Sequence, residues 1–482
     1  MPTPILIRDA AWAVVWDASA RGHAYARGMD ILLEGGRIAA VAHHDPDARV
    51  PDGTEVVDGR RLLVMPGLVN IHTHPTSALP ARGVREDHGV PEQQMTGLFE
   101  RLQAFRIDQA GQAAGMRLAY AELMSAGVTS VVDLSQPFPD WLGIMRESGL
   151  RVWAGPGFAD AHWGMEAPQT VTWMWNRENG RTQFEAAKRV MQEAVADNSG
   201  RLSGIVFPAQ IDTVGEDLLR QSAAWAAEAG LPFTTHISQA VVEVREMIRR
   251  HGITPIQWAA AIGLLGPRSI LGHAIFVDEH SSIGWHTARD IGLVAEHGAT
   301  VAHCPTPFAL YGEHLKHFGK YRARGVNMGF GTDCAPHNLI EEMRLAIMLA
   351  RGVARDVAAA DTNSVFHAAT VGGADALGRP DLGRLAPGAA GDVVLVDLAH
   401  PLMSPPRDPL RALLFHAADR AVQRVIVAGE TVFANGRPTR LDVTEAAGIL
   451  ADSQAKMLRD ARGRDYRGRS GDEIAPLSLP LH

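Results

Sequence analysis

The chain has 482 residues, 46% hydrophobic and 21% charged, with a formal net charge of −8. This composition is ordinary for a globular protein, and the length exceeds one ordinary core, so we expect a large domain plus a smaller one. The sequence has no block of basic residues, no apolar stretch long enough to span a bilayer and no signal-peptide pattern. Its two cysteines are too few for a disulfide framework. These features argue against nucleic-acid or membrane partners and predict a cytoplasmic protein.

The first 64 residues carry short β signals separated by turn residues. The signals are Ile5–Ile7, Trp12–Trp16, Asp30–Leu33 and Ile38–Val41, with Gly35-Gly36 between the last two. Short runs of β-favouring residues with hairpin punctuation predict strands. Residues 1–64 are therefore expected to form the N-terminal part of a small β-sandwich.

Eight apolar runs separated by longer, mostly amphipathic stretches follow. The runs are Met65–His74, Val128–Leu134, Arg151–Phe158, Ser203–Pro208, Pro232–His236, Ser269–Phe276, Thr300–Cys304 and Val326–Asp333. The helical patterns between them include Gln112–Ala126, Phe184–Ala196, Gly215–Gly230 and His286–Gly298. Such alternation is typical of buried parallel strands. It predicts an α/β fold in which residues 65–385 form a (β/α)8 TIM-like barrel, with a doubly wound open sheet as the alternative.

The C-terminal flank returns to a β pattern and then becomes helical. Its β signals are Asp392–Val396, Arg424–Val427 and Thr431–Phe433. We expect residues 386–440 to complete the sandwich, so that one small domain is built from both chain ends. Residues 441–482 are expected to form a C-terminal helix, over Val443–Arg459, and a loosely held tail.

The end of the first barrel run favours a metal site. His72 and His74 are separated by one residue, so on a strand both imidazoles would face the same side. This spacing at a strand end is typical of a pair of zinc ligands. The simpler interpretation is two histidines with ordinary hydrogen bonds, but two neighbouring buried rings cost desolvation free energy unless something compensates.

Three further candidates also lie at the ends of strand-like runs. His236 is expected to ligate the metal. His273 would either ligate it or hydrogen-bond the attacking water or the substrate, and the second role is favoured because three histidines and one carboxylate already fill a catalytic site with its water. Asp333 would bind weakly and take a proton from water that the metal activates, the alternative role being a helix N-cap. In a closed barrel these strand ends ring one mouth, which favours the barrel over the open sheet.

At these positions the chain resembles the amidohydrolase superfamily, in the branch of cytosine deaminases, adenosylhomocysteine deaminases and triazine chlorohydrolases. The matching motifs run across nearly the full length: Pro66-Gly67-Leu68-Val69-Asn70 with His72-Thr73-His74, Arg82-Gly83, His236-Ile237-Ser238-Gln239, Gly272-His273, Val301-Ala302-His303-Cys304-Pro305 and Gly331-Thr332-Asp333. The resemblance implies a mononuclear site, with one divalent metal on His72, His74, His236 and Asp333, assisted by His273. Binuclear members carry a modified lysine at the end of strand four, and residues 204–210 contain no lysine. Zinc is expected, with iron or manganese as alternatives.

Two departures from this family change the expected chemistry. Deaminases of the branch carry a His-x-x-Glu motif whose Glu shuttles a proton to the leaving amine, and this chain has Gln239 there. An amide cannot donate and accept a proton as a carboxylic acid does, so Gln239 would orient the substrate instead. The leaving group would then be protonated through Asp333 or His273, or would need little help. The family often has Pro-His on strand four, whereas this chain has Pro208-Ala209-Gln210.

The remaining pocket candidates are Gln210, His162, Trp163 and His303. His162 and Trp163 follow the third barrel run and would form a lid or pocket wall. Aromatic side chains there suit a flat or apolar substrate, although ordinary packing explains an aromatic cluster equally well. His303 ends the seventh run, near the expected mouth.

Taken together, these features predict a metal-dependent hydrolase for a small, largely planar nitrogen compound, with Asp333, His273 and Gln239 in catalytic roles. The first interpretation is an aminohydrolase or chlorohydrolase of an N-heterocycle. Hydrolysis of an amide, carbamate or urea bond is the alternative, which Gln239 keeps open. A non-catalytic homologue used for assembly would be expected to lose ligands, and this chain retains them all. A homo-oligomer, a dimer or larger, is expected.

Overall fold

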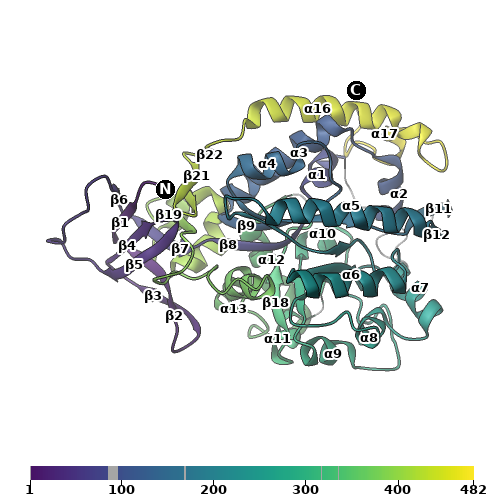
Figure 1. Ribbon diagram of the computed structural model, residues 1–482, viewed down its shortest axis with the longest axis horizontal. Coiled ribbons are helices and arrows are strands. Elements are labelled where there is room, and N and C mark those ends of the chain that lie inside the picture. The colour runs from purple at the N-terminus through teal and green to yellow at the C-terminus, as the bar shows by residue number, and fades with distance from the viewer. Residues whose placement is uncertain (1, 85–95, 168–169, 316, 335, 482) are drawn as a thin grey trace.

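A closed barrel of parallel strands forms the centre of the molecule (Figure 1). The computed structural model describes residues 2–84, 96–167, 170–315, 317–334 and 336–481. The barrel strands are β8 (Leu68–Thr73), β9 (Val128–Ser135), β10 (Arg151–Phe158), β13 (Leu202–Gly204) with β14 (Phe207–Pro208), β15 (Phe233–Ile237), β16 (Ser269–His273), β17 (Thr300–His303) and β18 (Asn327–Phe330). All eight predicted runs therefore contain a barrel strand, the fourth being split in two.

Strand pairing closes this sheet on itself. The order runs β13-β10-β9-β8-β18-β17-β16-β15. Parallel bridges from Val206 to Phe233 and from Gln210 to His236 join its two ends. This closure confirms the predicted barrel and excludes the open sheet.

Helices cover the outside of the barrel. Those that follow barrel strands include α3 (Gln109–Ser125), α4 (Trp141–Ser148), α5 (Arg177–Val195), α6 (Glu216–Ala229), α7 (Val241–His251), α8 (Pro255–Ala261), α9 (Asp290–Glu296) and α12 (Leu339–Ala354). The α5 helix shows why these segments are helical. Asn176 caps its first turn by accepting a hydrogen bond from the Asn179 N–H, and Phe184, Ala187 and Met191 form a buried stripe at helical spacing.

Further helices lie between these along the chain. They are α1 (Pro75–Ala78), α2 (Thr96–Ala104), α10 (Pro305–Leu310), α11 (Phe318–Ala323), α13 (Thr362–His367), α14 (Gly373–Ala376) and α15 (Pro409–Ala412). A β-hairpin follows β10, formed by β11 (Ala161–Ala167) and β12 (Thr170–Trp175). Among the described residues, no helix combines the length and apolarity needed to cross a membrane.

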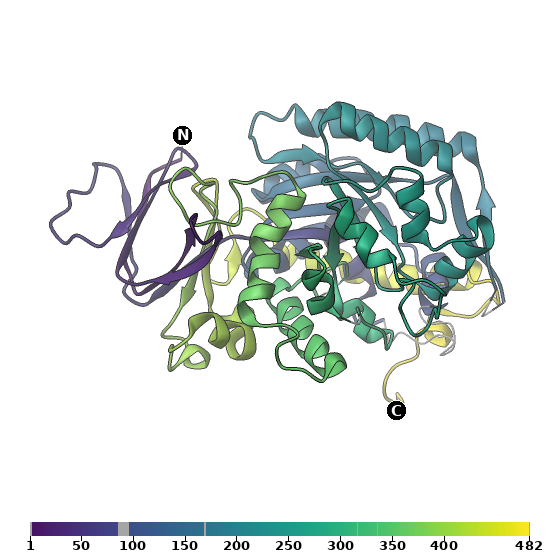
Figure 2. The same cartoon turned by 90° about the horizontal axis from the view of Figure 1, so that it is seen from below.

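Two sheets from the two ends of the chain pack together beside the barrel (Figure 2). One has the order β5-β4-β1-β6 and the other β22-β21-β20-β19-β7-β2-β3. Their bounds are β1 (Ile5–Ala10), β2 (Trp12–Asp17), β3 (Gly22–Ala26), β4 (Met29–Glu34), β5 (Arg37–His43), β6 (Glu55–Asp58), β7 (Leu62–Pro66), β19 (Val393–Asp397), β20 (Val422–Val427), β21 (Glu430–Ala434) and β22 (Arg437–Pro438). A shared core that includes Ile7, Ile31, Val393 and Ile426 joins the chain ends. The domain boundaries proposed above stay predictions.

The apolar run Met65–His74 is divided between the sandwich and the barrel. Its first residues belong to β7, which pairs with β19 in the sandwich, and the rest form β8 in the barrel. The break falls at Gly67, where a Cβ atom would lie 2.1 Å from Thr129 Oγ1. Only glycine fits there without displacing Thr129. The barrel strands therefore begin next to the sandwich, and their carboxyl ends open on the opposite side.

The C-terminal helix packs along the barrel beside α3 (Figure 1). It is α16 (Val443–Asp460), followed by the short α17 (Gly471–Ile474). Asp442 caps its first turn by accepting from the Thr444 and Glu445 N–H groups. Ser453 and Lys456 bind Asp108, the N-cap of α3. The predicted helix, Val443–Arg459, ends one residue earlier than the observed one.

A buried ion pair joins the barrel to the sandwich. Arg151, at the start of β10, donates from Nε to Asp392 Oδ2 at 2.7 Å and from Nη2 to Asp392 Oδ1 at 3.0 Å. Asp392 Oδ1 also accepts from the Ala428 N–H at 2.8 Å. Both side chains are buried, so removing either partner leaves an uncompensated charge.

We expect Arg151→Ala to lower the free energy of unfolding by about 3 kcal/mol, as loss of one partner from a buried pair does. Urea unfolding followed by circular dichroism measures the effect. The matched control is Arg60→Ala, which breaks the exposed ion pair with Asp58 and should change stability by less than about 1 kcal/mol. Equal effects of the two substitutions would contradict the proposed role of the buried pair.

Candidate metal centre and active site

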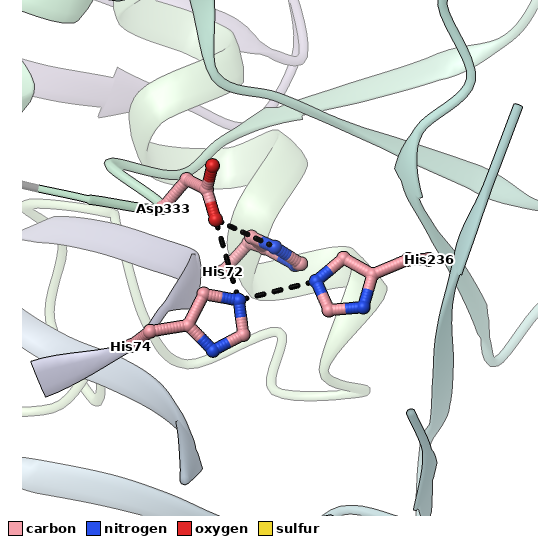
Figure 3. Close-up of side chains that lie close together, drawn as sticks. All are labelled: His72, His74, His236 and Asp333. Atoms are coloured by element: carbon pink, nitrogen blue, oxygen red, sulfur yellow. Dashed lines mark hydrogen bonds and ion pairs between the residues drawn. The ribbon is translucent and has the colours of Figure 1, made fainter. Parts of the chain in front are cut away.

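Four side chains converge at the mouth formed by the carboxyl ends of the barrel strands (Figure 3). His74 Nε2 lies 3.1 Å from His236 Nε2 and 3.3 Å from Asp333 Oδ1, and His72 Nε2 lies 3.5 Å from the same carboxylate oxygen. One ligand atom from each of the four residues lies within 4.8 Å of all the others. The structure thus brings together the four metal ligands expected from the sequence.

Backbone carbonyl groups orient two of the imidazoles. His74 Nδ1 lies 2.6 Å from the Leu134 carbonyl oxygen, and His236 Nδ1 lies 2.5 Å from the Ala209 carbonyl oxygen. A carbonyl only accepts, so each Nδ1 carries a proton and each ring turns its Nε2 atom toward the other. Two Nε2 atoms 3.1 Å apart must share a proton or give their lone pairs to a cation between them. This orientation by the other ring nitrogen is typical of metal-ligating histidines.

The third imidazole lacks a hydrogen bond. His72 is fully buried, and among the described residues neither of its ring nitrogens has a hydrogen-bond partner, the Asp333 carboxylate lying 3.5 Å from Nε2. A buried polar group without a partner carries a desolvation penalty, which a bound metal ion would remove. The residues present therefore fit a divalent metal ion.

The charge states also suit a divalent ion. Burial, and then the neighbouring imidazoles, lower the pKa of His236 well below its ordinary value, and burial lowers the pKa of His72. Both rings are therefore neutral near pH 7, as ligation requires. Burial opposes ionisation of Asp333, but contacts with His72 and His74 hold the pKa of this carboxyl well below its usual range. Burial opposes a charge on His74, but the Asp333 carboxylate raises the pKa of this ring, so a bound divalent ion would take the place of a proton there.

A close backbone approach positions Asp333. The Asp333 N–H donates to the His72 carbonyl oxygen and the His74 N–H donates to the Asp333 carbonyl oxygen, both at 2.9 Å. A Cβ atom at Gly331 would lie 2.5 Å from the His72 carbonyl oxygen, so a larger residue would push these segments apart. Asp333 itself has a φ of +52°, a strained value for a non-glycine residue, which these contacts hold.

A buried polar cluster behind the ligands was not assigned a role from the sequence. Asn70 Oδ1 accepts from the His72 N–H at 3.1 Å, and Asn70 Nδ2 donates to Thr332 Oγ1 at 2.9 Å. His337 Nδ1 lies 3.2 Å from Thr73 Oγ1 and 3.0 Å from Thr332 Oγ1. These contacts tie β8 to the loop that carries Asp333. Asn70 stands in a motif quoted above, but its partner is 262 residues away.

His273 lies beside the four ligands. It is 1% exposed, and its ring centroid is 4.7 Å from that of His72 and 5.3 Å from that of His236. Neither of its ring nitrogens has a hydrogen-bond partner in the part of the chain that the structure describes. Burial lowers the pKa of His273 well below its ordinary value, so the ring is neutral. A neutral imidazole here has one donor and one acceptor to offer to water or a substrate.

Gln210 and Gln239 form a direct pair at the mouth. Gln210 Nε2 donates to Gln239 Oε1 at 2.9 Å, and Gln210 Oε1 is buried with no hydrogen-bond partner among the residues described. Glu243 fixes the turn that carries Gln239 by accepting from the N–H groups of Ser238, Gln239 and Ala240. The pair therefore retains one free carbonyl oxygen together with N–H donors.

The remaining pocket candidates are placed differently. His162 is exposed on β11. Trp163 is half-buried, with its indole Nε1 donating to Asp212 Oδ2 at 2.9 Å and its ring against Phe99. His303 is buried beside Phe318 and Phe330, where burial and then His314 lower its pKa to about 3. Neither His162 nor His303 belongs to the four-ligand group, and their contacts with substrate stay predictions.

Comparison with known proteins places the chain in a family. The model of the amidohydrolase family matches residues 63–432. The chain belongs to the amidohydrolase family, as the sequence motifs predicted. It is therefore a hydrolase of the amidohydrolase superfamily.

Its relatives include enzymes named for adenosine derivatives. A 5-methylthioadenosine/S-adenosylhomocysteine deaminase from Natronomonas pharaonis is 30% identical over 443 residues, covering 91% of this chain and 96% of the relative. A 5'-deoxyadenosine deaminase from Methanothermobacter thermautotrophicus is 28% identical over 429 residues, covering 88% and 93% of the two chains.

Solved structures share the fold along almost the whole chain. An adenosine deaminase from Xanthomonas campestris with bound zinc superposes with a TM-score of 0.80 at 25% identity, covering 95% of this chain and 99% of the other. An atrazine chlorohydrolase from Arthrobacter aurescens with zinc gives a TM-score of 0.79 at 21% identity, covering 93% and 100%. The second likeness shows the fold alone.

We expect the wild-type protein, prepared with excess metal and desalted, to hold about one divalent ion per chain, and His236→Ala to hold less than half as much, because a ligand is lost. Elemental analysis measures both. The control is His162→Ala, which removes an exposed imidazole outside the ligand group and should keep the wild-type content. A wild-type protein that stays metal-free after loading would contradict the site.

Proposed function

We propose that this chain replaces a leaving group on a carbon atom of a small, largely planar N-heterocycle, as an aminohydrolase or chlorohydrolase that uses one divalent metal ion. The observation that carries the proposal is the convergence of three imidazoles and one carboxylate at the carboxyl ends of the barrel strands. Zinc is the preferred ion, since nitrogen and oxygen ligands in this number suit it, and iron or manganese would accept the same donors.

Each residue of the site has a task in this reaction. His72, His74, His236 and Asp333 would hold the metal ion. When bound, a divalent ion supplies Lewis acidity and lowers the pKa of water. The ionised Asp333 carboxylate accepts a proton from the attacking water. The neutral His273 ring donates a hydrogen bond toward the attacked position or accepts one from the water.

The amide pair supports recognition of a heterocycle. The free carbonyl oxygen of the Gln210–Gln239 pair would accept from a substrate N–H, and its N–H donors would meet a ring nitrogen. Trp163 with Phe99 would add an aromatic surface for a planar ring. The names of the relatives, which refer to adenosine derivatives, support a substrate of this shape.

Gln239 restricts the leaving group. An amine leaves a tetrahedral carbon readily only after it is protonated, and an amide side chain cannot deliver that proton. Chloride and other stabilised anions leave without it. A nitrogen leaving group would have to take its proton from Asp333 or His273 instead, and that route is equally open to the second candidate function, hydrolysis of an amide, carbamate or urea bond.

Gln239→Glu tests this restriction. The substitution keeps an oxygen acceptor for Gln210 Nε2 and adds an acid, so we expect ammonia release from adenosine derivatives to rise by about 100-fold, within the usual range for general acid catalysis. Chloride release from chlorotriazines should change by less than about threefold, because chloride needs no proton. Steady-state assays of zinc-loaded wild type and variant measure both products.

The control for this test is Gln210→Glu, which places the acid on the neighbouring residue of the pair. Ammonia release that is fast in the wild type and unchanged by Gln239→Glu would contradict the restriction. The second candidate function would be supported by release of carboxylate or carbon dioxide from amides and carbamates, without ammonia from adenosine derivatives or chloride from chlorotriazines. A metal-loaded protein that is inactive on adenosine derivatives, on chlorotriazines, and on amides and carbamates would favour the non-catalytic homologue.

The cytoplasmic location and the homo-oligomer stay predictions.

A further inference from the structure

The hairpin of β11 and β12 carries two tryptophans on one face. Trp163 and Trp173 are directly opposite one another in the antiparallel register, so their side chains share a face. Figure 1 shows the hairpin at the end of the molecule away from the sandwich, near α2 and α7. Trp163 also packs edge-to-face against Phe99 of α2, with ring centroids 4.7 Å apart. The hairpin thus stands on the side of the barrel onto which the site opens.

Both indoles bind the same buried carboxylate. Trp163 Nε1 and Trp173 Nε1 donate to Asp212 Oδ2 at 2.9 and 2.7 Å, and Asp212 is fully buried. A buried indole needs a hydrogen-bond acceptor, and a charged acceptor gives a stronger bond than a neutral one. Sharing one oxygen atom fixes the two rings relative to each other as well as to the loop that carries Asp212.

Arg250 supports the same arrangement from α7. Its Nη1 donates to the Asp212 carbonyl oxygen at 2.7 Å, and its guanidinium carbon lies 5.2 Å from the Trp173 ring centroid and 5.0 Å from that of Trp175. A guanidinium over an indole face is attracted to the ring, and its positive charge also offsets that of the buried carboxylate. The hairpin is therefore held from two sides.

The loop that carries Asp212 also orients two residues of the site. Its Ala209 carbonyl oxygen accepts from His236 Nδ1, and its Gln210 side chain binds Gln239. The base of the hairpin is tied to the same loop, since the N–H groups of Asp160 and Ala161 both donate to the Thr213 carbonyl oxygen. One short segment, residues 209–213, thus connects the hairpin to the metal ligand and to the amide pair.

We propose that Asp212 is a positioning residue whose carboxylate clamps Trp163 and Trp173, so that the β11–β12 hairpin forms a fixed aromatic wall on the side of the barrel onto which the site opens and selects substrates with a planar group. The proposal rests on the proposed function for its substrate. Asp212 itself contacts the indoles and not the reacting atoms. Its effect on catalysis is therefore on substrate binding, through the position of the wall.

The test compares zinc-loaded Asp212→Asn, Trp163→Phe and Trp173→Phe with the wild type. Each Phe variant keeps an aromatic ring and removes one indole donor, and Asp212→Asn keeps the shape and removes the charge. The matched control is Trp175→Phe, which lies on the same strand, is exposed, and has no bond to Asp212. Three readouts are needed: hydrogen exchange of residues 161–175, metal content, and KM with kcat.

We expect the hairpin amides of Asp212→Asn to exchange hydrogen about tenfold faster than those of the wild type, in line with the loss of one hydrogen bond to a charged group. For the same reason KM should rise by about tenfold. kcat should change by less than about threefold and metal content should not change, because the loss is of substrate binding. Trp173→Phe and Trp163→Phe should act in the same direction, and they carry the test if Asp212→Asn does not fold.

The proposed clamp would be overturned if all three variants kept the hydrogen-exchange rates and the KM of the wild type. Equal changes in Trp175→Phe would also overturn it, since that variant leaves both bonds to Asp212 in place. A fall in kcat and metal content with KM unchanged would show a purely structural role and would overturn the assignment. If the wild type turns over no substrate, the proposed function fails, but the exchange rates still decide whether Asp212 holds the hairpin.

Discussion

The need to bring three imidazoles and one carboxylate to a single point is the constraint on which the rest of this site depends. His74 and His236 each commit their Nδ1 proton to a backbone carbonyl, so their Nε2 atoms face each other across 3.1 Å, and His74 Nε2 also lies 3.3 Å from Asp333 Oδ1. His72 is buried beside them and has no hydrogen-bond partner among the described residues. Such a cluster of buried polar groups is costly in a protein interior unless a proton or a cation is shared between them. A divalent ion would satisfy all four side chains at once, which one shared proton cannot do.

The architecture supplies this geometry through backbone contacts more than through side-chain packing. The Leu134 and Ala209 carbonyl groups orient the rings of His74 and His236. Two backbone hydrogen bonds between residues 72–74 and Asp333 fix the position of the carboxylate. These contacts come from neighbouring barrel strands, whose register is set by closure of the sheet. The sandwich and the buried ion pair of Arg151 with Asp392 secure the opposite end of the barrel, which leaves the mouth free for chemistry.

The parts of the fold that could be predicted are those with a local signal. Buried parallel strands are continuous apolar runs, so Val128–Leu134 and Arg151–Phe158 nearly coincide with β9 and β10. The ligands stand at the ends of such runs. No local sequence pattern predicts the role of Asp212, because its indole partners are 49 and 39 residues away along the chain. They contact Asp212 only once the hairpin has folded against its loop. The break of β7 from β8 at Gly67 likewise reflects a contact with Thr129 that no local pattern contains.

X-ray absorption at the zinc edge of the zinc-loaded protein tests the proposed ligands most directly, because it reports the atoms bound to the metal. We expect a shell of nitrogen and oxygen atoms only, with the outer-shell scattering of three imidazoles, and the loss of one imidazole in His236→Ala. A sulfur atom in the shell would instead place Cys334 or Cys304 on the metal. A shell with sulfur, or one without imidazole scattering, would contradict the site described here.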